Sequence, residues 1–101
     1  MTVDELETIR QQFIRCWIID PGMRNLDRMV VRVRVSLNPD RTVRSAVVTD
    51  YVDPQDPIYR SFAESAVRAV LNPRCSPVDL PPRKFHLMRT FTLRFSGNER
   101  G

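Results

Sequence analysis

The sequence predicts an α+β fold, in which two helices pack on one face of a small three-stranded antiparallel sheet in the order α-β-β-α-β. Two segments carry apolar residues at helical spacing, and three carry them at every second position, as in half-buried strands. A turn motif separates the first two strand segments, and the second helix separates the last two. Each strand has one apolar face, which helices on one side of the sheet can bury.

The first helix is predicted to begin at Thr2, because Thr2-Val3-Asp4-Glu5 matches a capping box in which Thr2 and Glu5 satisfy each other's free amides. A stripe of apolar residues then recurs at helical spacing. It consists of Leu6, Ile9, Phe13, Cys16 and Trp17. The helix is predicted to end at Asp20-Pro21-Gly22.

A hairpin is predicted next, because the apolar period changes to two at Arg28. The buried face of its first strand contains Met29, Val31, Val33, Val35 and Leu37, and these residues alternate with Arg32, Arg34 and Ser36. The turn is Asn38-Pro39-Asp40-Arg41, in which Pro39 restricts φ at the second position. The segment from Val43 to Tyr51 is predicted to return as the partner strand.

The second helix is predicted to begin with Asp56 as its N-cap and Pro57 as its first residue, where no amide hydrogen is needed. Its apolar stripe is Tyr59, Phe62, Ala63, Ala66 and Val70. Asn72-Pro73 should end the helix, and a proline-rich connector over 76–82 leads to the last strand. If that strand pairs with the first one, the sheet order is second, first, last, and Thr90 to Phe95 lies on an exposed edge.

Size and charge limit the function classes. The 101 residues, 42% of them hydrophobic, are enough for one modest core, so residues 1–101 are predicted to form a single domain. No apolar run approaches the roughly 20 residues that cross a bilayer. The net charge of +4 is compatible with nucleic acid, an anionic membrane or an acidic protein as partner. The arginines are scattered, which favours an ordinary solvated surface.

Neither catalysis nor a bound metal is expected. His86 is the only histidine, and no motif of a hydrolase, zinc protease or phosphate loop occurs. Cys16 and Cys75 are separated by 59 positions and have no zinc-ligand spacing, so a disulfide and two buried thiols both remain open. The spacing of Asp50, Asp53 and Asp56 does not match that of the calcium ligands in an EF-hand loop. We therefore expect a non-enzymatic domain with no cofactor.

Four segments of the chain resemble the C-terminal domain of TolA, which is similar in turn to that of TonB. They are RCWIIDPGM closing the first helix, VVRVRVSLNPDRTV in the hairpin, YRSFAESAVRAVL in the second helix and CSPVDLPPRKFHLMRTFTLRF into the last strand. The resemblance extends over about residues 6 to 96. It departs from the family at Arg41, where Gly is usual because the turn often needs a left-handed residue, so Arg41 is predicted to have a strained backbone. It also departs at His86-Leu87-Met88, where an aromatic residue is commoner.

The resemblance implies a non-catalytic periplasmic domain of a longer protein that is held in the inner membrane by an N-terminal anchor outside this sequence. It also implies a disulfide between Cys16 and Cys75. In that family the domain contacts TolB within the Tol-Pal system, which maintains the outer membrane during cell division. Colicins and filamentous phage coat proteins exploit it, so they are further expected partners.

The binding mechanism that fits this family is strand addition, in which an extended partner segment pairs with an open sheet edge. The predicted edge consists of Thr90, Phe91, Thr92, Leu93, Arg94 and Phe95. Tyr59 and Phe62 are candidate walls of a neighbouring pocket, with core packing as the alternative interpretation.

Two other functions compete with this one. A TonB-like domain would bind the box peptides of outer-membrane transporters, but the paired cysteines and the LPP-x-K-F pattern favour TolA. A basic sheet could also bind single-stranded nucleic acid. Arg32 and Arg34 on the first strand, however, are not interleaved with the aromatic residues that stack on bases, so we expect no nucleic acid partner.

Overall fold

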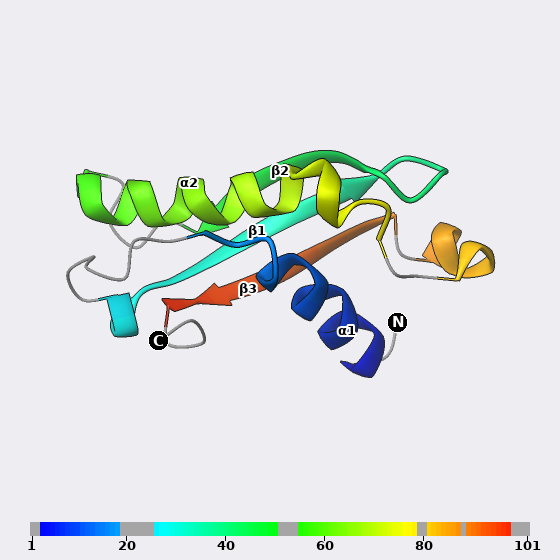
Figure 1. Ribbon diagram of the computed structural model, residues 1–101, viewed down its shortest axis with the longest axis horizontal. Coiled ribbons are helices and arrows are strands. Elements are labelled where there is room, and N and C mark those ends of the chain that lie inside the picture. Colours follow the sequence, from blue (N-terminus) through cyan, green and yellow to red (C-terminus); the bar gives the residue numbers. More distant parts are fainter. Residues whose placement is uncertain (1–2, 19–25, 51–54, 79–80, 88, 98–101) are drawn as a thin grey trace.

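The computed structural model describes residues 3–18, 26–50, 55–78, 81–87 and 89–97. Its main elements are helix α1 (Val3–Ile14), strands β1 (Val30–Leu37) and β2 (Val43–Asp50), helix α2 (Pro57–Leu71) and strand β3 (Thr90–Ser96), shown in Figure 1. Short 3-10 helices cover Leu26–Arg28, Pro73–Cys75 and Pro82–Leu87. The predicted α+β class and the α-β-β-α-β order are confirmed.

The three strands form an antiparallel sheet in the order β2-β1-β3, as the sequence predicted. The ladder between β1 and β3 is regular, with paired residues from Val30 and Ser96 at one end to Ser36 and Thr90 at the other. The ladder between β1 and β2 is interrupted twice, between Arg32 and Val33 and between Ser36 and Leu37. The sheet thus has one regular edge strand and one irregular edge strand.

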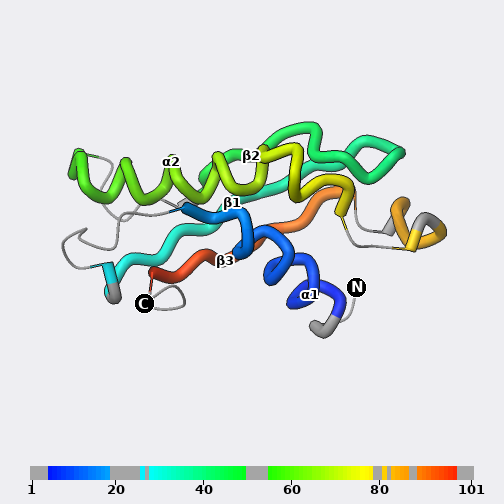
Figure 2. Tube along the Cα trace, viewed as in Figure 1, coloured from blue at the N-terminus to red at the C-terminus, as the bar shows by residue number. Residues whose placement is uncertain are grey.

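Both helices cover the same face of the sheet. Helix α2 lies along β2 and β1, whereas α1 lies across β3 (Figures 1 and 2). The strands bury one alternating set of side chains beneath them: Val31, Val33, Val35, Leu37, Phe91, Leu93 and Phe95. The alternation arises because successive side chains of a strand point to opposite faces, and it leaves the other face of the sheet uncovered by the two helices.

Trp17 occupies the centre of the core. Its side chain is fully buried, and its ring meets Phe62 of α2 and Phe95 of β3 edge to face, with centroids 5.5 and 5.2 Å away. The buried indole N–H donates to Ser65 Oγ. Trp17 therefore joins the second helix to the last strand through both apolar contacts and a satisfied polar group.

The first helix is shorter than predicted, since it ends at Ile14 and leaves Cys16 and Trp17 beyond it. The last amides bond three residues back rather than four, from Cys16 to Phe13 and from Trp17 to Ile14. This tightened turn carries Cys16 to its disulfide partner and Trp17 into the core. Tertiary contacts overrode the helical period that both residues fit.

The boundaries of α2 agree with the sequence, whereas the first strand begins later than predicted. Asp56 caps α2, its Oδ1 accepting from Ile58 N at 2.9 Å, and Asn72 ends the helix. Arg28 lies in a 3-10 helix rather than in the first strand. Thr2, residues 20–22, Tyr51 and Asp53, on which further predictions fell, lie outside the described residues.

The hairpin turn has the backbone conformation that the sequence predicted for Arg41. Its φ is 72°, in the left-handed region that residues with a side chain, apart from Asn and Asp, mostly avoid. The turn is held by hydrogen bonds from Arg41 N to Asn38 O and from Asn38 N to Thr42 O, both 2.8 Å long. Arg41 O also accepts from Val78 N, which fastens the connector after α2 to the hairpin.

Among the described helices, none is long and apolar enough to cross a membrane. The described residues likewise contain no group of three or more His, Cys, Asp or Glu side chains that could hold a metal ion.

Candidate functional site

The free edge of β3 is the candidate site. Two hydrogen bonds at the ends of β3 show which of its residues direct their backbone groups toward β1. Leu37 N donates to Arg89 O over 2.8 Å, and Gly97 N donates to Met29 O over 2.9 Å. In an antiparallel ladder, hydrogen-bonded pairs alternate with non-bonded pairs. Odd-numbered residues of β3 therefore direct their backbone groups toward β1, and even-numbered residues direct theirs away from the sheet.

The six residues predicted as the binding edge divide into two sets. Phe91, Leu93 and Phe95 are buried, and their backbone groups are used in the ladder with β1. Thr90, Thr92 and Arg94 are exposed, and their backbone groups point outward. Within the described part of the chain, no backbone hydrogen bond joins β3 to an element other than β1. A row of donors and acceptors is thus available on its outer side.

The opposite edge of the sheet, formed by β2, is a poorer surface for pairing. Its two register irregularities twist an edge and interrupt the regular spacing of donors and acceptors. The ladder of β3 has no such interruption. An extended segment can therefore pair continuously with β3 more easily than with β2.

A pocket of about 310 Å³ lies between α1 and the free edge of β3. It is lined by Leu6, Glu7, Arg10, Thr92, Leu93 and Arg94. The side chains of Thr92 and Arg94 belong to the uncovered face, so their presence in the lining places this pocket at the edge itself. Leu6 and Leu93 give it an apolar part.

A charged pair on α1 borders this pocket. Arg10 donates from Nε to Glu7 Oε2 at 2.9 Å and from Nη2 to Glu7 Oε1, and Gln11 Nε2 donates to the same carboxylate. The hydrogen bond from Arg10, followed by that from Gln11, lowers the pKa of Glu7 below its ordinary value. The pocket wall is therefore both apolar and charged.

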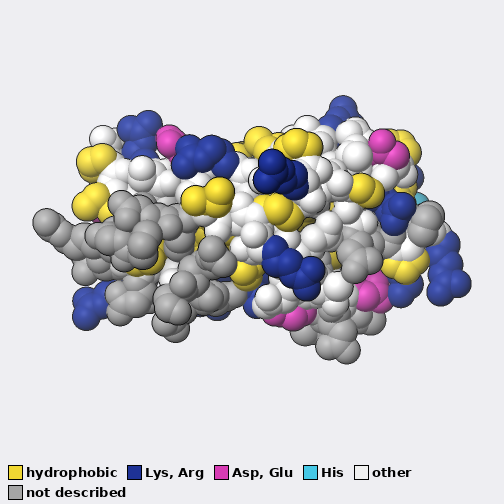
Figure 3. Space-filling model, in the orientation of Figure 1, with side chains coloured by type: hydrophobic (Ala, Val, Ile, Leu, Met, Phe, Trp, Pro, Cys, Tyr) yellow, Lys and Arg dark blue, Asp and Glu magenta, His cyan; other side chains and the backbone are white. Residues whose placement is uncertain are grey.

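The uncovered face of the sheet is basic next to the same edge. Arg32 and Arg94 are paired directly in register on β1 and β3, and both are exposed. Arg34, two residues further along β1 on the same face, is also exposed and is paired with Thr92. On the face visible in Figure 3, by contrast, Lys and Arg side chains are scattered among apolar and neutral ones.

Tyr59 and Phe62 belong to the core. Phe62 is fully buried and Tyr59 is 5% exposed, with its hydroxyl donating to Val30 O at 2.8 Å. Neither residue lines the pocket beside β3. Core packing, the alternative interpretation, is therefore the role that fits Tyr59 and Phe62, because α2 lies over β1 and β2 rather than over the free edge.

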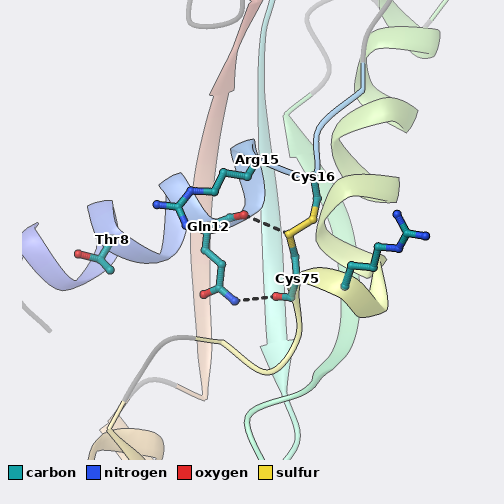
Figure 4. A pocket seen from close by; sticks show the side chains of 6 residues that line it. Thr8, Gln12, Arg15, Cys16 and Cys75 are labelled. Atoms are coloured by element: carbon teal, nitrogen blue, oxygen red, sulfur yellow. Dashed lines mark hydrogen bonds between the residues drawn. A yellow bond between two sulfur atoms is a disulfide. The ribbon is translucent and has the colours of Figure 1, made fainter.

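The structure joins Cys16 to Cys75 by a disulfide, with Cα atoms 6.4 Å apart. Gln12 of α1 reinforces this connection, because its Nε2 donates to Cys75 O at 2.8 Å and to Pro77 O at 2.9 Å. Figure 4 shows the disulfide and the hydrogen bond from Gln12 to Cys75 beside a second pocket, whose lining includes Thr8, Arg15 and Arg74. The bridge joins the turn that follows α1 to the 3-10 helix Pro73–Cys75 that follows α2.

Sequence reasoning missed the contribution of α1 to the candidate site. Leu6 was assigned only to the buried stripe, although it is partly buried and lines the pocket. Glu7 and Arg10 are opposite charges three positions apart, a spacing that predicts an ion pair on one helix face. That local signal could have identified the pair, but not the strand to which it lies close.

A comparison with solved structures supports the fold. No family model and no curated protein matches the chain. Among solved structures, the chain is similar to a solution NMR structure of TolAIII bound to a peptide derived from the N-terminus of TolB. The match has a TM-score of 0.67 and 26% identity, and it covers 95% of this chain and 74% of the other. The chain therefore has the fold of the TolA C-terminal domain.

Proposed function

We propose that this chain is a non-catalytic interaction domain of a Tol-Pal cell-envelope system, and that it binds an extended N-terminal segment of TolB by strand addition to β3. The observation that carries the proposal is the regular outer edge of β3, with the backbone groups of Thr90, Thr92 and Arg94 directed away from β1. Such an edge is a template for another strand. The similar TolAIII structure contains a bound TolB peptide.

The cellular setting is part of the same proposal. A disulfide between Cys16 and Cys75 supports an oxidising compartment such as the periplasm. We place the domain there as the end of a longer protein anchored in the inner membrane, with a role in outer-membrane integrity and cell division. The same edge would then serve colicins and filamentous phage coat proteins.

The fold supports binding rather than catalysis. His86 is exposed and lies in the 3-10 helix Pro82–Leu87, away from the disulfide-bonded Cys16. A bonded sulfur cannot act as a nucleophile. The described strands carry Arg32, Arg34 and Arg94 on the uncovered face without an aromatic side chain among them, which is a poor surface for stacking bases.

Amide hydrogen exchange with a peptide derived from the N-terminus of TolB tests the proposal. The amides of Phe91, Leu93 and Phe95 are protected by β1 before binding, so they should change little. The amides of Thr90, Thr92 and Arg94 should exchange fast in the free protein and become protected in the complex. Protection that appears on β2 instead, or no binding, would contradict the proposal.

A proline variant provides an independent test. Thr92→Pro removes one outward amide hydrogen, and proline is tolerated on an edge strand when its nitrogen faces solvent. We expect this variant to fold and to lose most of its affinity for the peptide. Thr92→Ala, which keeps the amide, is the matched control and should bind nearly as the parent does. Equal affinities of the two variants would exclude strand addition at this position.

A further inference from the structure

We propose that the segment added to β3 places an acidic side chain opposite Arg94 and an apolar side chain opposite Leu93. This inference rests on the proposed function and specifies the chemistry of its partner. It follows from the charges on the uncovered face and from the pocket on the helix-covered face, which flank the same edge.

The charge argument begins with Arg32 and Arg94, which are paired directly in register. Like charges at directly opposite positions of an antiparallel pair are destabilising, because their side chains lie on the same face at short distance. On its β2 side, Arg32 is paired in register with Asp50. Arg94 belongs to the edge strand, so among the described residues it has no second neighbour in this row, and an added segment would supply one.

The neighbouring rows carry no cation at the edge. Arg34 lies between Val47 and Thr92, and Ser36 lies between Ser45 and Thr90. An acidic residue of the partner therefore gains most opposite Arg94, the cation on the adjacent strand, because Arg34 belongs to β1 and lies one strand further away. The partner residue opposite Arg94 is thus the one position of an added segment that prefers an acidic side chain on this face. This preference can set the register of the added segment.

The second argument concerns the other face. A partner residue opposite Leu93 would direct its side chain toward the helices, since Leu93 itself faces the core and residues paired across strands share a face. That position lies over the pocket of about 310 Å³ between α1 and β3. Leu6 and Leu93 supply its apolar part, so an aliphatic side chain fits there.

The two preferences fall on adjacent residues of the partner. Side chains alternate between faces whichever way the added strand runs, so the pattern of an acidic residue next to an apolar one holds for parallel and antiparallel addition. The preferred ligand is therefore an extended acidic-apolar segment.

The test uses a peptide derived from the N-terminus of TolB, with Asp and then Asn substituted at each position in turn. One position should bind more tightly with Asp than with Asn, by about two- to fivefold at low salt, as expected for an exposed ion pair. This preference should decrease at high salt. It should disappear in Arg94→Gln, and it should persist in Arg68→Gln, which removes an equal charge from the exposed side of α2.

At a position adjacent to the Asp-preferring one, Leu should bind more tightly than Ser. If Arg94→Gln and Arg68→Gln reduce the Asp preference equally, only net charge matters and the inference is wrong. Binding with protected edge amides but without any Asp preference would overturn this inference and leave strand addition intact. No binding at all would overturn both proposals.

Discussion

The indole Nε1 of Trp17 donates a hydrogen bond to Ser65 Oγ over 2.9 Å within the core, and Ser65 Oγ in turn donates to Phe62 O. This chain satisfies the polar group of the large buried ring. It also connects the segment after α1 to the buried face of α2, beside the edge-to-face contact of Trp17 with Phe62.

Ser65→Ala should lower the free energy of unfolding by about 1–3 kcal/mol, because the buried indole N–H loses its acceptor. Urea denaturation monitored by Trp17 fluorescence measures the change. Ser61→Ala is the matched control, since Ser61 is exposed on the same helix and should change stability little. If Ser65→Ala and Ser61→Ala have the same free energy of unfolding, the buried hydrogen bond does not contribute to stability, and only the helix propensity of the substituted residue matters.

Arg41→Gly should raise the melting temperature by roughly 4–8 °C. The left-handed φ of 72° costs arginine on the order of 1 kcal/mol relative to glycine, and that amount corresponds to such a shift in a domain of this size. Arg41→Ala separates backbone strain from the loss of the arginine side chain, because alanine keeps the strain. A melting temperature for Arg41→Gly at or below that of Arg41→Ala would contradict the assignment.

Removal of the disulfide should destabilise the domain by about 4 kcal/mol, since the bridge closes a loop with a sequence separation of 59. Chemical denaturation of Cys16→Ser/Cys75→Ser, compared with the parent, measures this. A reducing agent should lower the stability of the parent by a similar amount and leave the double variant unchanged. A large effect of reductant on the variant would show that the loss has another origin.

The carboxylate of Asp40 in the hairpin turn should have a pKa below the ordinary value of an aspartate. Hydrogen bonds from the Thr42 hydroxyl and then from the Thr42 amide stabilise ionised Asp40 and lower its pKa from 3.8. A pKa lower in the folded than in the unfolded state contributes stability that is present above about pH 3.8 and is lost as the pH falls through the folded value.

The pKa of Asp40 can be followed by NMR of its carboxyl carbon. Thr42→Val removes the largest contribution and should raise this pKa toward 3.8, whereas Thr49→Val on the neighbouring strand should leave it unchanged. An equal pKa in the parent and in Thr42→Val would show that the hydroxyl does not stabilise the charge.

Element type and order followed from local patterns. The alternation of Val31, Val33 and Val35 specifies a strand with one buried face wherever it is placed. Asp56 and Pro57 specify the start of α2, because they meet the hydrogen-bonding and φ requirements of a helix N-terminus by themselves. The strain at Arg41 was likewise readable from its position in the turn.

The end of α1 could not be read from the sequence. Cys16 and Trp17 fit the helical period, but the disulfide and the central place of Trp17 in the core end the helix at Ile14. The energy of burying a large aromatic ring exceeds the propensity of two residues to extend a helix.

The sequence by itself determined which segments become helices and strands. The helix between the last two strands also led to the prediction that β3 is an edge strand, provided that it pairs with β1. Only the tertiary structure decided which backbone groups of that edge point outward, that Arg32 is paired with Arg94, and that Leu6 lies beside Leu93. The physical reason is that periodicity and capping depend on neighbours along the chain. Ladder phase, cross-strand pairing and the docking of α1 depend instead on contacts between residues about 50 to 90 positions apart.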